Sequence, residues 1–262
     1  MIRRTLEMLN TLGFNPLQSA RVAALTPRFV ADYVRFRQQQ RTSESALPFG
    51  KLYPCLLDKY DSSGAATGQY FHQDLLVAQR IFAAAPQLHA DVGSRIDGFV
   101  AHVASFRPIV VFDIRAQPSK VHNIEFHVAD FMGTVPERFH EFCDSLSCLH
   151  ALEHFGLGRY GDPICVDGFI RGFENLLKVL KTDGTLYLSV PIGPPRIEFN
   201  AHRIFSVSHL YELFANRARV RRISYVDDRG DLHDGVDGSD EAIATNFGCN
   251  NGCGIFELVK LP

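Results

Sequence analysis

Three polar side chains suited to acid–base chemistry, His150, Glu153 and His154, directly follow a predicted β-strand. Segment 145–193 has the pattern of strand, polar loop, amphipathic helix, Asp-Gly turn and strand, which is one αβ unit of a parallel sheet. Open α/β sheets bind ligands beyond the carboxyl ends of their strands. We therefore expect His154 to act as a general base with Glu153 beside it, because a free imidazole has a pKa of about 6.5. His202, which follows the next strand, is the alternative base.

A second candidate binding element is the loop Asp91-Val92-Gly93-Ser94, which joins a predicted strand to a predicted helix. Glycine at this position lets the backbone approach a ligand closely. The amides at the start of the following helix are free to bind an anionic group. The loop therefore predicts a ligand-binding turn.

The next two predicted strands also end in carboxylates. Asp113 follows the loop by about twenty residues, the position at which an acidic side chain accepts hydrogen bonds from a ribose diol. Asp130 and Phe131 end the third strand and offer a carboxylate and an aromatic ring to the edge and face of an adenine. Acidic strand ends in this order and spacing predict a site for an adenosine-containing cofactor.

With these residues, the chain from about residue 70 to 262 resembles the class I S-adenosylmethionine-dependent methyltransferases. The segments Leu152-Glu153-His154, LKTDGTLYLSVP and AHRIFSVSHLYELF resemble small-molecule methyltransferases of the ubiquinone-biosynthesis type. The chain also looks like an uncharacterised domain family that shares YFHQD, DVGSRIDG and EHFGLGRYGD, and this second resemblance implies no known activity.

The methyltransferase resemblance implies a fold, a cofactor and site residues. The fold is α/β: a Rossmann-like, seven-stranded, mostly parallel sheet with a C-terminal antiparallel hairpin. The cofactor is S-adenosylmethionine, and the reaction is methyl transfer to a small hydroxylated molecule. The implied cofactor-binding residues are Asp91, Gly93 and Ser94 for the methionyl end, Asp113 for ribose, and Asp130 and Phe131 for adenine. Tyr70 would belong to a lid over the cofactor, or else pack at a helix N-terminus.

The loop departs from the family pattern, because Arg95 and Asp97 stand where two further glycines are usual. Arg95 would pair with the methionyl carboxylate, obstruct the pocket or bind a phosphate. Two alternatives follow: a non-catalytic Rossmann-like binding domain, and a nucleotide- or dinucleotide-binding enzyme with an altered glycine loop. The second lacks the Gly-x-Gly-x-x-Gly spacing of dinucleotide sites.

The motif His150-x-x-Glu153-His154 is also that of the inverted zinc peptidases, whose two histidines lie on one helix. Gly156 and Gly158 follow too closely for such a helix. Some ubiquinone-type enzymes hold a divalent ion at this segment, but we predict no metal site. The plainest alternative is that Glu153 caps a turn and His150 is a core histidine.

The chain's 262 residues predict a helical extension and loop over 1–68 and the Rossmann-like domain over 69–262. The first 41 residues hold seven arginines against two acidic residues, which favours a solvated helical face over docking to an acidic partner or membrane surface. The formal net charge of −2 argues against nucleic-acid binding. No apolar run approaches the roughly 18 residues of a membrane span, so we expect a cytoplasmic protein. The methyltransferase resemblance implies a small-molecule substrate. The sequence does not predict an oligomeric state.

The hydrophobic pattern also predicts the individual elements. Helices are expected over 1–45 (with stripes at Leu6, Leu9, Leu12 and 29–36), 73–84, 96–105, 136–142 and 166–180. Strands are expected over 89–94, 108–114, 124–131, 145–150 and 185–192, with 219–226 and 252–260 as a hairpin at the sheet edge.

Overall fold

The computed structural model describes residues 13–262. The chain divides into two compact units, Met1–Ala65, described from residue 13 onward, and Ala66–Pro262. We call them the N-terminal and C-terminal units. The domain boundary expected between residues 68 and 69 stays a prediction.

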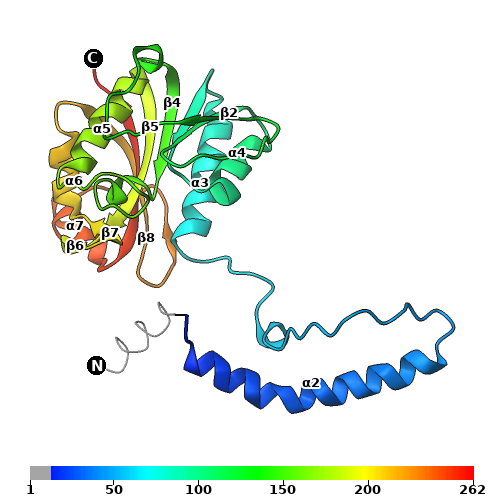
Figure 1. Cartoon of the computed structure of the whole chain (residues 1–262). Helices are drawn as coiled ribbons and strands as arrows, with labels where there is room; N and C mark the ends of the chain where they lie inside the picture. The colour runs from blue at the N-terminus through cyan, green and yellow to red at the C-terminus, as the bar shows by residue number, and fades with distance from the viewer. Residues whose placement is uncertain (1–12) are drawn as a thin grey trace. The chain divides into compact units, whose positions relative to one another are not determined.

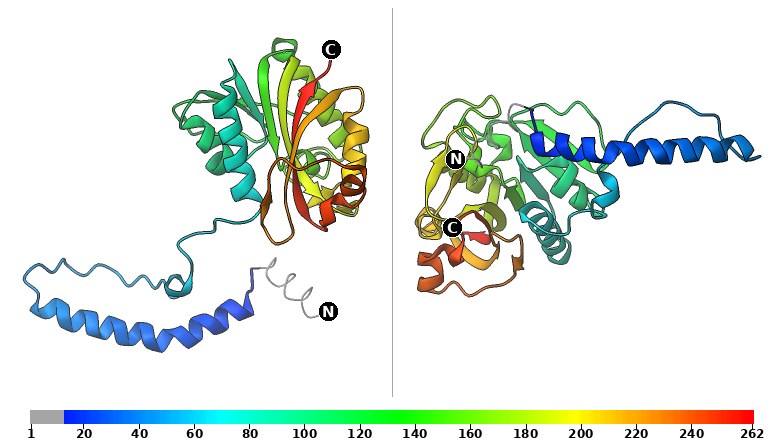
Figure 2. Two further views of the ribbon diagram at one scale, coloured as in Figure 1. Left: turned by 180° about the vertical axis from the view of Figure 1, so that it is seen from behind. Right: turned by 90° about the horizontal axis from the view of Figure 1, so that it is seen from below.

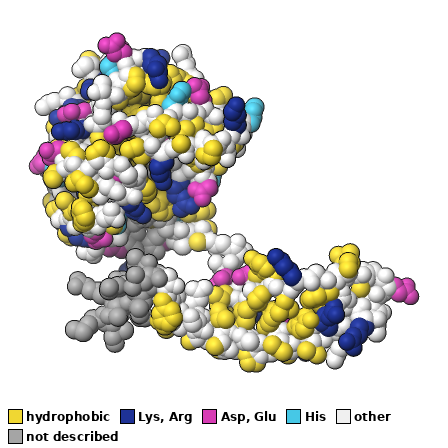
Figure 3. All heavy atoms as spheres, in the orientation of Figure 1, with side chains coloured by type: hydrophobic (Ala, Val, Ile, Leu, Met, Phe, Trp, Pro, Cys, Tyr) yellow, Lys and Arg dark blue, Asp and Glu magenta, His cyan; other side chains and the backbone are white. Residues whose placement is uncertain are grey.

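The N-terminal unit is dominated by one helix, α2 (Pro16–Thr42). The Asn15 side chain accepts a hydrogen bond from the amide of Gln18 (2.9 Å) and so caps the helix start, where proline is also favoured. No residue of α2 is buried, and Figure 3 shows apolar and arginine side chains exposed together along this unit. The stripe expected at Leu6, Leu9 and Leu12 lies outside the described residues.

The C-terminal unit is built on one sheet in the strand order β3-β2-β1-β4-β5-β10-β8-β9 (Figure 1). Strands β1 to β5 pair in parallel, and β10 is antiparallel to both β5 and β8. The strands of this sheet are β1 (His89–Val92), β2 (Ile109–Asp113), β3 (Ile124–Val128), β4 (Cys143–Leu149), β5 (Leu180–Ile192), β8 (Ala218–Val226), β9 (Leu232–His233) and β10 (Gly252–Lys260). The predicted α/β fold class is confirmed.

Helices cover both faces of the sheet. The main helical elements are α3 (Gln69–Ala84), η2 (Ile96–Val100), α4 (Ala101–Ala104), α5 (Gly168–Val179), α6 (Val207–Phe214) and α7 (Asp240–Ala244). The short turns are η1 (Asp58–Tyr60), η3 (Glu137–Phe139), η4 (Leu152–His154) and η5 (Asn246–Gly248), and a separate hairpin joins β6 (Arg196–Glu198) to β7 (His202–Ile204). Among residues 13–262, no helix combines the length and the apolar character that crossing a bilayer requires.

Alternate residues of strand β2 pack into two separate hydrophobic clusters, one on each face of the sheet. Val110 and Phe112 of β2 pack in a cluster with α5 and α6, whereas Ile109 and Val111 pack with α3, η2 and α4. Successive side chains of a strand point to opposite faces, so this separation follows from the continuous apolar run of β2. Figure 1 shows the corresponding two helical layers.

The expected C-terminal antiparallel hairpin is present, because β8 and β10 pair with each other. β10 lies inside the sheet between β5 and β8, and the two-residue strand β9 adds an eighth strand at the edge. Figure 2 shows β10, in red, flanked on both sides by other strands. Every residue of β10 from Gly252 to Val259 is buried, so its apolar character reflects a central position.

Two expected helices differ in the structure. The helix expected over 136–142 is wrong: only the single turn η3 forms, and Phe139 of that turn packs edge-on against Phe112 with ring centroids 4.9 Å apart. The helix expected over 166–180 ends at Val179, because Leu180 pairs with Cys143 in the sheet. At both positions, contacts with distant residues determine whether the helix forms or where it ends.

Candidate functional site

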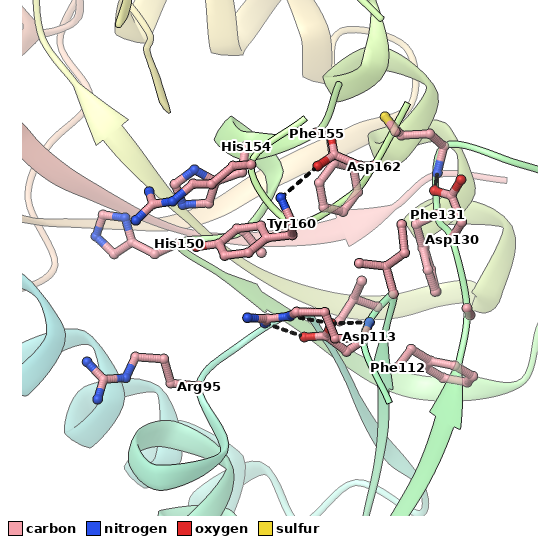
Figure 4. Close-up of a pocket in the computed structure, with 18 of the residues that line it drawn as sticks. Arg95, Phe112, Asp113, Asp130, Phe131, His150, His154, Phe155, Tyr160 and Asp162 are labelled. Carbon is pink, nitrogen blue, oxygen red and sulfur yellow. Dashed lines mark hydrogen bonds and ion pairs between the residues drawn. The ribbon is translucent and has the colours of Figure 1, made fainter. Parts of the chain in front are cut away.

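A cavity of about 280 Å³ lies where four parallel strands end. Its lining comes from the segments that follow β1, β2, β3 and β4 and from the start of α3. Figure 4 shows His150, His154 and Tyr160 on one side of this pocket, with Asp113 and Phe112 across from them. The topology therefore brings most of the predicted site residues to one place.

The loop after β1 needs its glycine. Gly93 has a φ of +74°, and a Cβ on it would lie 2.9 Å from the Cβ of Ala151, closer than carbon atoms pack. Gly93 lines the pocket, but Asp91 and Ser94 do not. The Asp91 carboxylate accepts hydrogen bonds from the Ser94 amide (3.0 Å), the Ser94 hydroxyl (2.6 Å) and the Ser147 hydroxyl (2.5 Å). Asp91 and Ser94 thus shape the loop from the core side.

A buried polar network lies beneath this loop. Burial raises the pKa of Asp91 to about 6, in opposition to its hydrogen bonds from Ser147 and Ser94. Burial also lowers the pKa of the neighbouring His89 to about 3, so this imidazole is neutral. Its ring nitrogens contact the hydroxyls of Ser145 (2.8 Å) and Ser147 (3.2 Å). The sequence analysis did not identify His89 or the two serines.

Asp113 ends β2 at the pocket, but Arg115 bonds to both of its carboxylate oxygens. Arg115 Nε donates to Oδ1 (3.0 Å), Nη2 donates to Oδ2 (2.8 Å), and the Arg115 amide donates to Oδ1 (2.8 Å). The hydrogen bond with Asp113 raises the pKa of Arg115. The Arg115 guanidinium also lies 4.4 Å from the ring centroid of Tyr160. Sequence reasoning missed Arg115, which stands in an irregular segment without a motif.

Asp130 and Phe131 line the pocket at the end of β3. One oxygen of Asp130 accepts a hydrogen bond from the Met132 amide (2.8 Å), which shapes the turn after the strand. Phe131 is only 3% exposed, and its ring packs 5.6 Å from that of Phe112. Phe131 and Phe112 therefore form an aromatic wall at this end of the pocket.

His150 and Glu153 form a buried pair. His150 Nδ1 lies 2.8 Å from Glu153 Oε1. Burial opposes both charges, but Cys253 and Glu153 raise the pKa of His150 well above its usual value. The hydrogen bond and the charge of His150 lower the pKa of Glu153 despite its burial. The Tyr70 ring packs against that of His150 at a tilt, with ring centroids 4.9 Å apart. His150 lines the pocket, whereas Glu153 lies behind it.

This pair leaves two polar atoms without partners. Within the described part of the chain, His150 Nε2 and Glu153 Oε2 are buried and form no hydrogen bond. Buried polar atoms are nearly always satisfied by protein, water or ligand. Because His150 lines the pocket, its Nε2 is suited to contact a bound molecule.

His154 has the geometry of a general base. Its Nδ1 lies 2.6 Å from the carbonyl oxygen of Ala201. A carbonyl only accepts, so Nδ1 carries the proton and Nε2 presents its lone pair. Burial lowers the pKa of His154 and outweighs the opposite influence of Glu153, whose Oε1 is 3.7 Å from Nε2. His154 is therefore unprotonated at neutral pH.

Two other predicted candidates, His202 and Arg95, are engaged with neighbouring carboxylates. His202 does not line the pocket: its ring is 6.4 Å from that of His154, and its Nε2 is 3.4 Å from Glu198. Arg95 does line it, but its side chain is 60% exposed and pairs with Asp97 (2.9 Å). Figure 4 shows Arg95 apart from the other labelled side chains.

The loop 156–162, part of the EHFGLGRYGD segment for which no site role was predicted, lies at the pocket beside His154. The Asp162 carboxylate accepts hydrogen bonds from the amides of Gly156 (2.8 Å), Gly158 (3.1 Å) and Tyr160 (3.1 Å). These bonds lower the pKa of Asp162 and outweigh its partial burial. The loop presents Arg159 and Tyr160 to the pocket. Its alternating glycines, followed by an aspartate, were the available signal.

The arrangement differs from that of the inverted zinc peptidases. His150 directly follows β4 and only His154 lies on the short turn η4, and their Nδ1 atoms already bond to Glu153 and Ala201. In the part of the chain that the structure describes, no three His, Cys, Asp or Glu side chains gather as a metal site.

A family described as "Caenorhabditis protein of unknown function, DUF268" matches residues 113–225. This segment runs from the end of β2 into β8 and includes much of the pocket. No curated protein sequence matches the chain.

Solved structures resemble this one in fold. One is the 1,6-didemethyltoxoflavin-N1-methyltransferase of Burkholderia thailandensis with S-adenosylhomocysteine, at 14% identity and a TM-score of 0.50, covering 95% of this chain and 92% of that one. Another is an O-methyltransferase of a Brevibacillus brevis trans-AT PKS multienzyme with S-adenosylhomocysteine (17% identity, TM-score 0.51, 73% and 72% covered). A third is the [4+2]-cyclase SpnF (15% identity, TM-score 0.51, 72% and 81% covered). At these identities the similarity establishes the Rossmann-like methyltransferase fold.

Proposed function

We propose that the C-terminal unit is an S-adenosylmethionine-dependent methyltransferase that acts on a small hydroxylated molecule. The observation that carries this proposal is the unprotonated Nε2 of His154, held at the same pocket as Gly93 and Asp113. Two of the similar structures are described as methyltransferases with S-adenosylhomocysteine bound, which supports the cofactor at the level of the fold.

The residues at the pocket fit this cofactor. Gly93 leaves open the space that a Cβ would close against Ala151, and the unpartnered Nε2 of His150 offers a donor to a ligand oxygen. Asp113 would bind the ribose hydroxyls, and Asp130 with Phe131 would bind adenine. We assign Asp91 and Ser94 to shaping the loop around the methionyl end. Arg95 would remain at the mouth, within reach of the methionyl carboxylate.

Methyl transfer asks mainly for alignment and proton removal. When bound, the cofactor supplies a methyl group that its sulfonium already activates. His154 would accept the proton of the acceptor hydroxyl at Nε2, while the Ala201 carbonyl holds its tautomer. Glu153, 3.7 Å away, would stabilise the imidazolium that forms. Tyr70 and Tyr160 would exclude water from the two sides of the pocket.

Calorimetric titration with S-adenosylhomocysteine tests the proposal. We expect micromolar binding by the wild type and a loss of at least tenfold in Asp113→Ala, because the variant lacks the oxygens that would accept from the ribose. Asp237→Ala, a change at an exposed carboxylate that does not line this pocket, is the matched control. A folded wild type that does not bind would contradict the proposal.

One observation favours a different ligand at the same fold. The guanidinium of Arg115 donates hydrogen bonds to both oxygens of the Asp113 carboxylate, and guanidinium groups bind phosphates well. A nucleotide-binding enzyme or a non-catalytic binding domain would then replace the methyltransferase. Thermal protection by NAD or a nucleotide sugar, without protection by S-adenosylhomocysteine, would favour this alternative.

A further inference from the structure

The rim of the pocket carries a guanidinium that no carboxylate neutralises. Arg95 and Arg115 line the same pocket, and they pair with Asp97 and Asp113 respectively. Arg159 forms no ion pair with any carboxylate of residues 13–262. Its Nη1 donates to the carbonyl oxygen of Ala201 (3.2 Å), which leaves its other donors free.

Arg159 is held in place by the surrounding backbone. The Asp162 carboxylate bonds to the amides on both sides of Arg159, those of Gly158 and Tyr160. The loop is also tied down by the buried guanidinium of Arg203, whose four hydrogen bonds go to the carbonyls of Glu153, Phe155, Cys165 and Val166. Because the loop is already fixed, the Arg159 side chain loses little conformational entropy when it binds a ligand.

Arg159 and the proposed base share their contacts. The Ala201 carbonyl accepts from both His154 Nδ1 (2.6 Å) and Arg159 Nη1 (3.2 Å). The Tyr160 ring contacts both side chains, with its centroid 5.4 Å from the His154 ring and 5.2 Å from the Arg159 guanidinium. A group bound to Arg159 would therefore lie beside the His154 ring on its Nδ1 side, and the acceptor hydroxyl would extend from that group toward Nε2.

We propose that the methyl acceptor carries an oxyanionic group, a carboxylate or a phosphate, and that Arg159 binds this group so that the acceptor hydroxyl faces His154. This inference rests on the proposed function and names its substrate class. Arg159 would be a substrate-binding residue, distinct from Arg95 at the mouth near Tyr70. The positive charge of Arg159 also contributes to the lowered pKa of His154, after burial. An oxyanion on Arg159 would reduce that influence and make His154 a stronger base when the acceptor is bound.

The experiment measures binding of matched acidic and neutral probes by calorimetry, with and without saturating S-adenosylhomocysteine. The probes are 3,4-dihydroxybenzoate, its methyl ester, phenyl phosphate and phenol. The proteins are the wild type, Arg159→Ala, Arg159→Lys and Arg219→Ala, the last a change at an exposed arginine that does not line the pocket. Comparison of the benzoate with the phosphate shows which oxyanion the site accepts.

We expect at least one acidic probe to bind the wild type tenfold or more tightly than its neutral partner. Arg159→Ala should remove this preference, Arg159→Lys should retain part of it, and Arg219→Ala should behave as the wild type. S-adenosylhomocysteine affinity should be the same in all four proteins.

Three results would overturn the inference. The first is that no acidic probe binds better than its neutral partner. The second is an equal loss of acidic and neutral binding in Arg159→Ala. The third is a loss of S-adenosylhomocysteine affinity in that variant, which would assign Arg159 to the cofactor. Arg159-dependent anion binding by a protein that fails to bind S-adenosylhomocysteine would uphold the anion site and contradict the methyltransferase proposal.

Discussion

Arg115 covers both carboxylate oxygens of Asp113, at 3.0 Å to Oδ1 and 2.8 Å to Oδ2. The same guanidinium lies 4.4 Å from the Tyr160 ring, so the two sides of the pocket meet through this one side chain. A ribose diol on Asp113 must replace at least one of these hydrogen bonds. Cofactor binding and the position of Arg115 are therefore coupled.

The first prediction concerns this coupling. We expect Arg115→Ala to bind S-adenosylhomocysteine more tightly, by up to about fivefold, because a partly exposed ion pair is worth roughly 0.2–1 kcal/mol and no longer competes with the ribose. Calorimetry on the variant and on Arg219→Ala measures the difference. Weaker binding by Arg115→Ala would instead place the guanidinium among the cofactor's own contacts.

The second prediction concerns His154. We expect His154→Gln to lower the rate of methyl transfer by about 10²–10⁴, the usual contribution of a general base, with S-adenosylhomocysteine affinity unchanged. Because the pKa of His154 is lowered from 6.5, the wild-type rate should be half-maximal at a pH below 6.5 and should level off at higher pH. Rates of S-adenosylhomocysteine formation from pH 5 to 8 test both points. A variant that retains the wild-type rate and pH profile would remove His154 from the reaction.

The third prediction concerns the buried pair of His150 and Glu153. The pKa of His150 is raised from 6.5, so its stabilising charge is fully present below pH 6.5 and is lost as the pH rises through the raised value. The lowered pKa of Glu153 contributes above about pH 4.5 and is lost in more acidic solution. At pH 5.5 we expect Glu153→Gln to lower the unfolding free energy by roughly 3 kcal/mol, since His150 is left buried without its counter-charge.

Urea unfolding of Glu153→Gln at pH 5.5 and pH 9 checks the sign, and the loss should be larger at pH 5.5. Glu137→Gln, at an exposed glutamate, is the control and should match the wild type at both values. An equal loss at the two pH values would mean that packing, and not charge, accounts for the role of Glu153.

The fourth prediction concerns Asp91. Its pKa is about 6 in the folded protein and 3.8 when unfolded, so the folded state binds more protons between these values. Stability should therefore decrease as the pH rises from about 4 to about 6, by about 3 kcal/mol at 1.36 kcal/mol per pKa unit. Asp91→Asn lacks this titration. Relative to the wild type, the variant should gain about 3 kcal/mol of unfolding free energy between pH 4 and pH 7, and a constant difference would contradict the assignment.

Most of the fold could be predicted from the hydrophobic patterns of short segments of the sequence. The apolar run of β2 and the helical spacing of α5 each appear in one short segment of sequence. The insertion of β10 between β5 and β8 was not readable, because strand order depends on pairing between residues far apart in the chain. The expected helix at 136–142 failed because Phe139 gains more by packing on Phe112 than a short helix would provide.

The site was readable only in part. Strand ends identify Gly93, Asp113 and His154, since the topology brings such positions together. The direction of the side chains could not be predicted from the sequence. Asp91 points into the core, and Glu153 lies behind His150. Arg115 and Arg159 lie in irregular segments, where only the folded structure shows which partners they have and lack.

The position of β10 has a consequence for the order of synthesis. This strand, Gly252–Lys260, pairs with β5 on one side and β8 on the other, so the parallel strands and β8 cannot join in one sheet before residue 260 has left the ribosome. Until then β5 presents an unpaired, apolar edge, the kind of surface that recruits strands from other chains. Folding of the C-terminal unit should consequently be completed after translation of its last strand, and nascent chains would need protection of this edge until that moment.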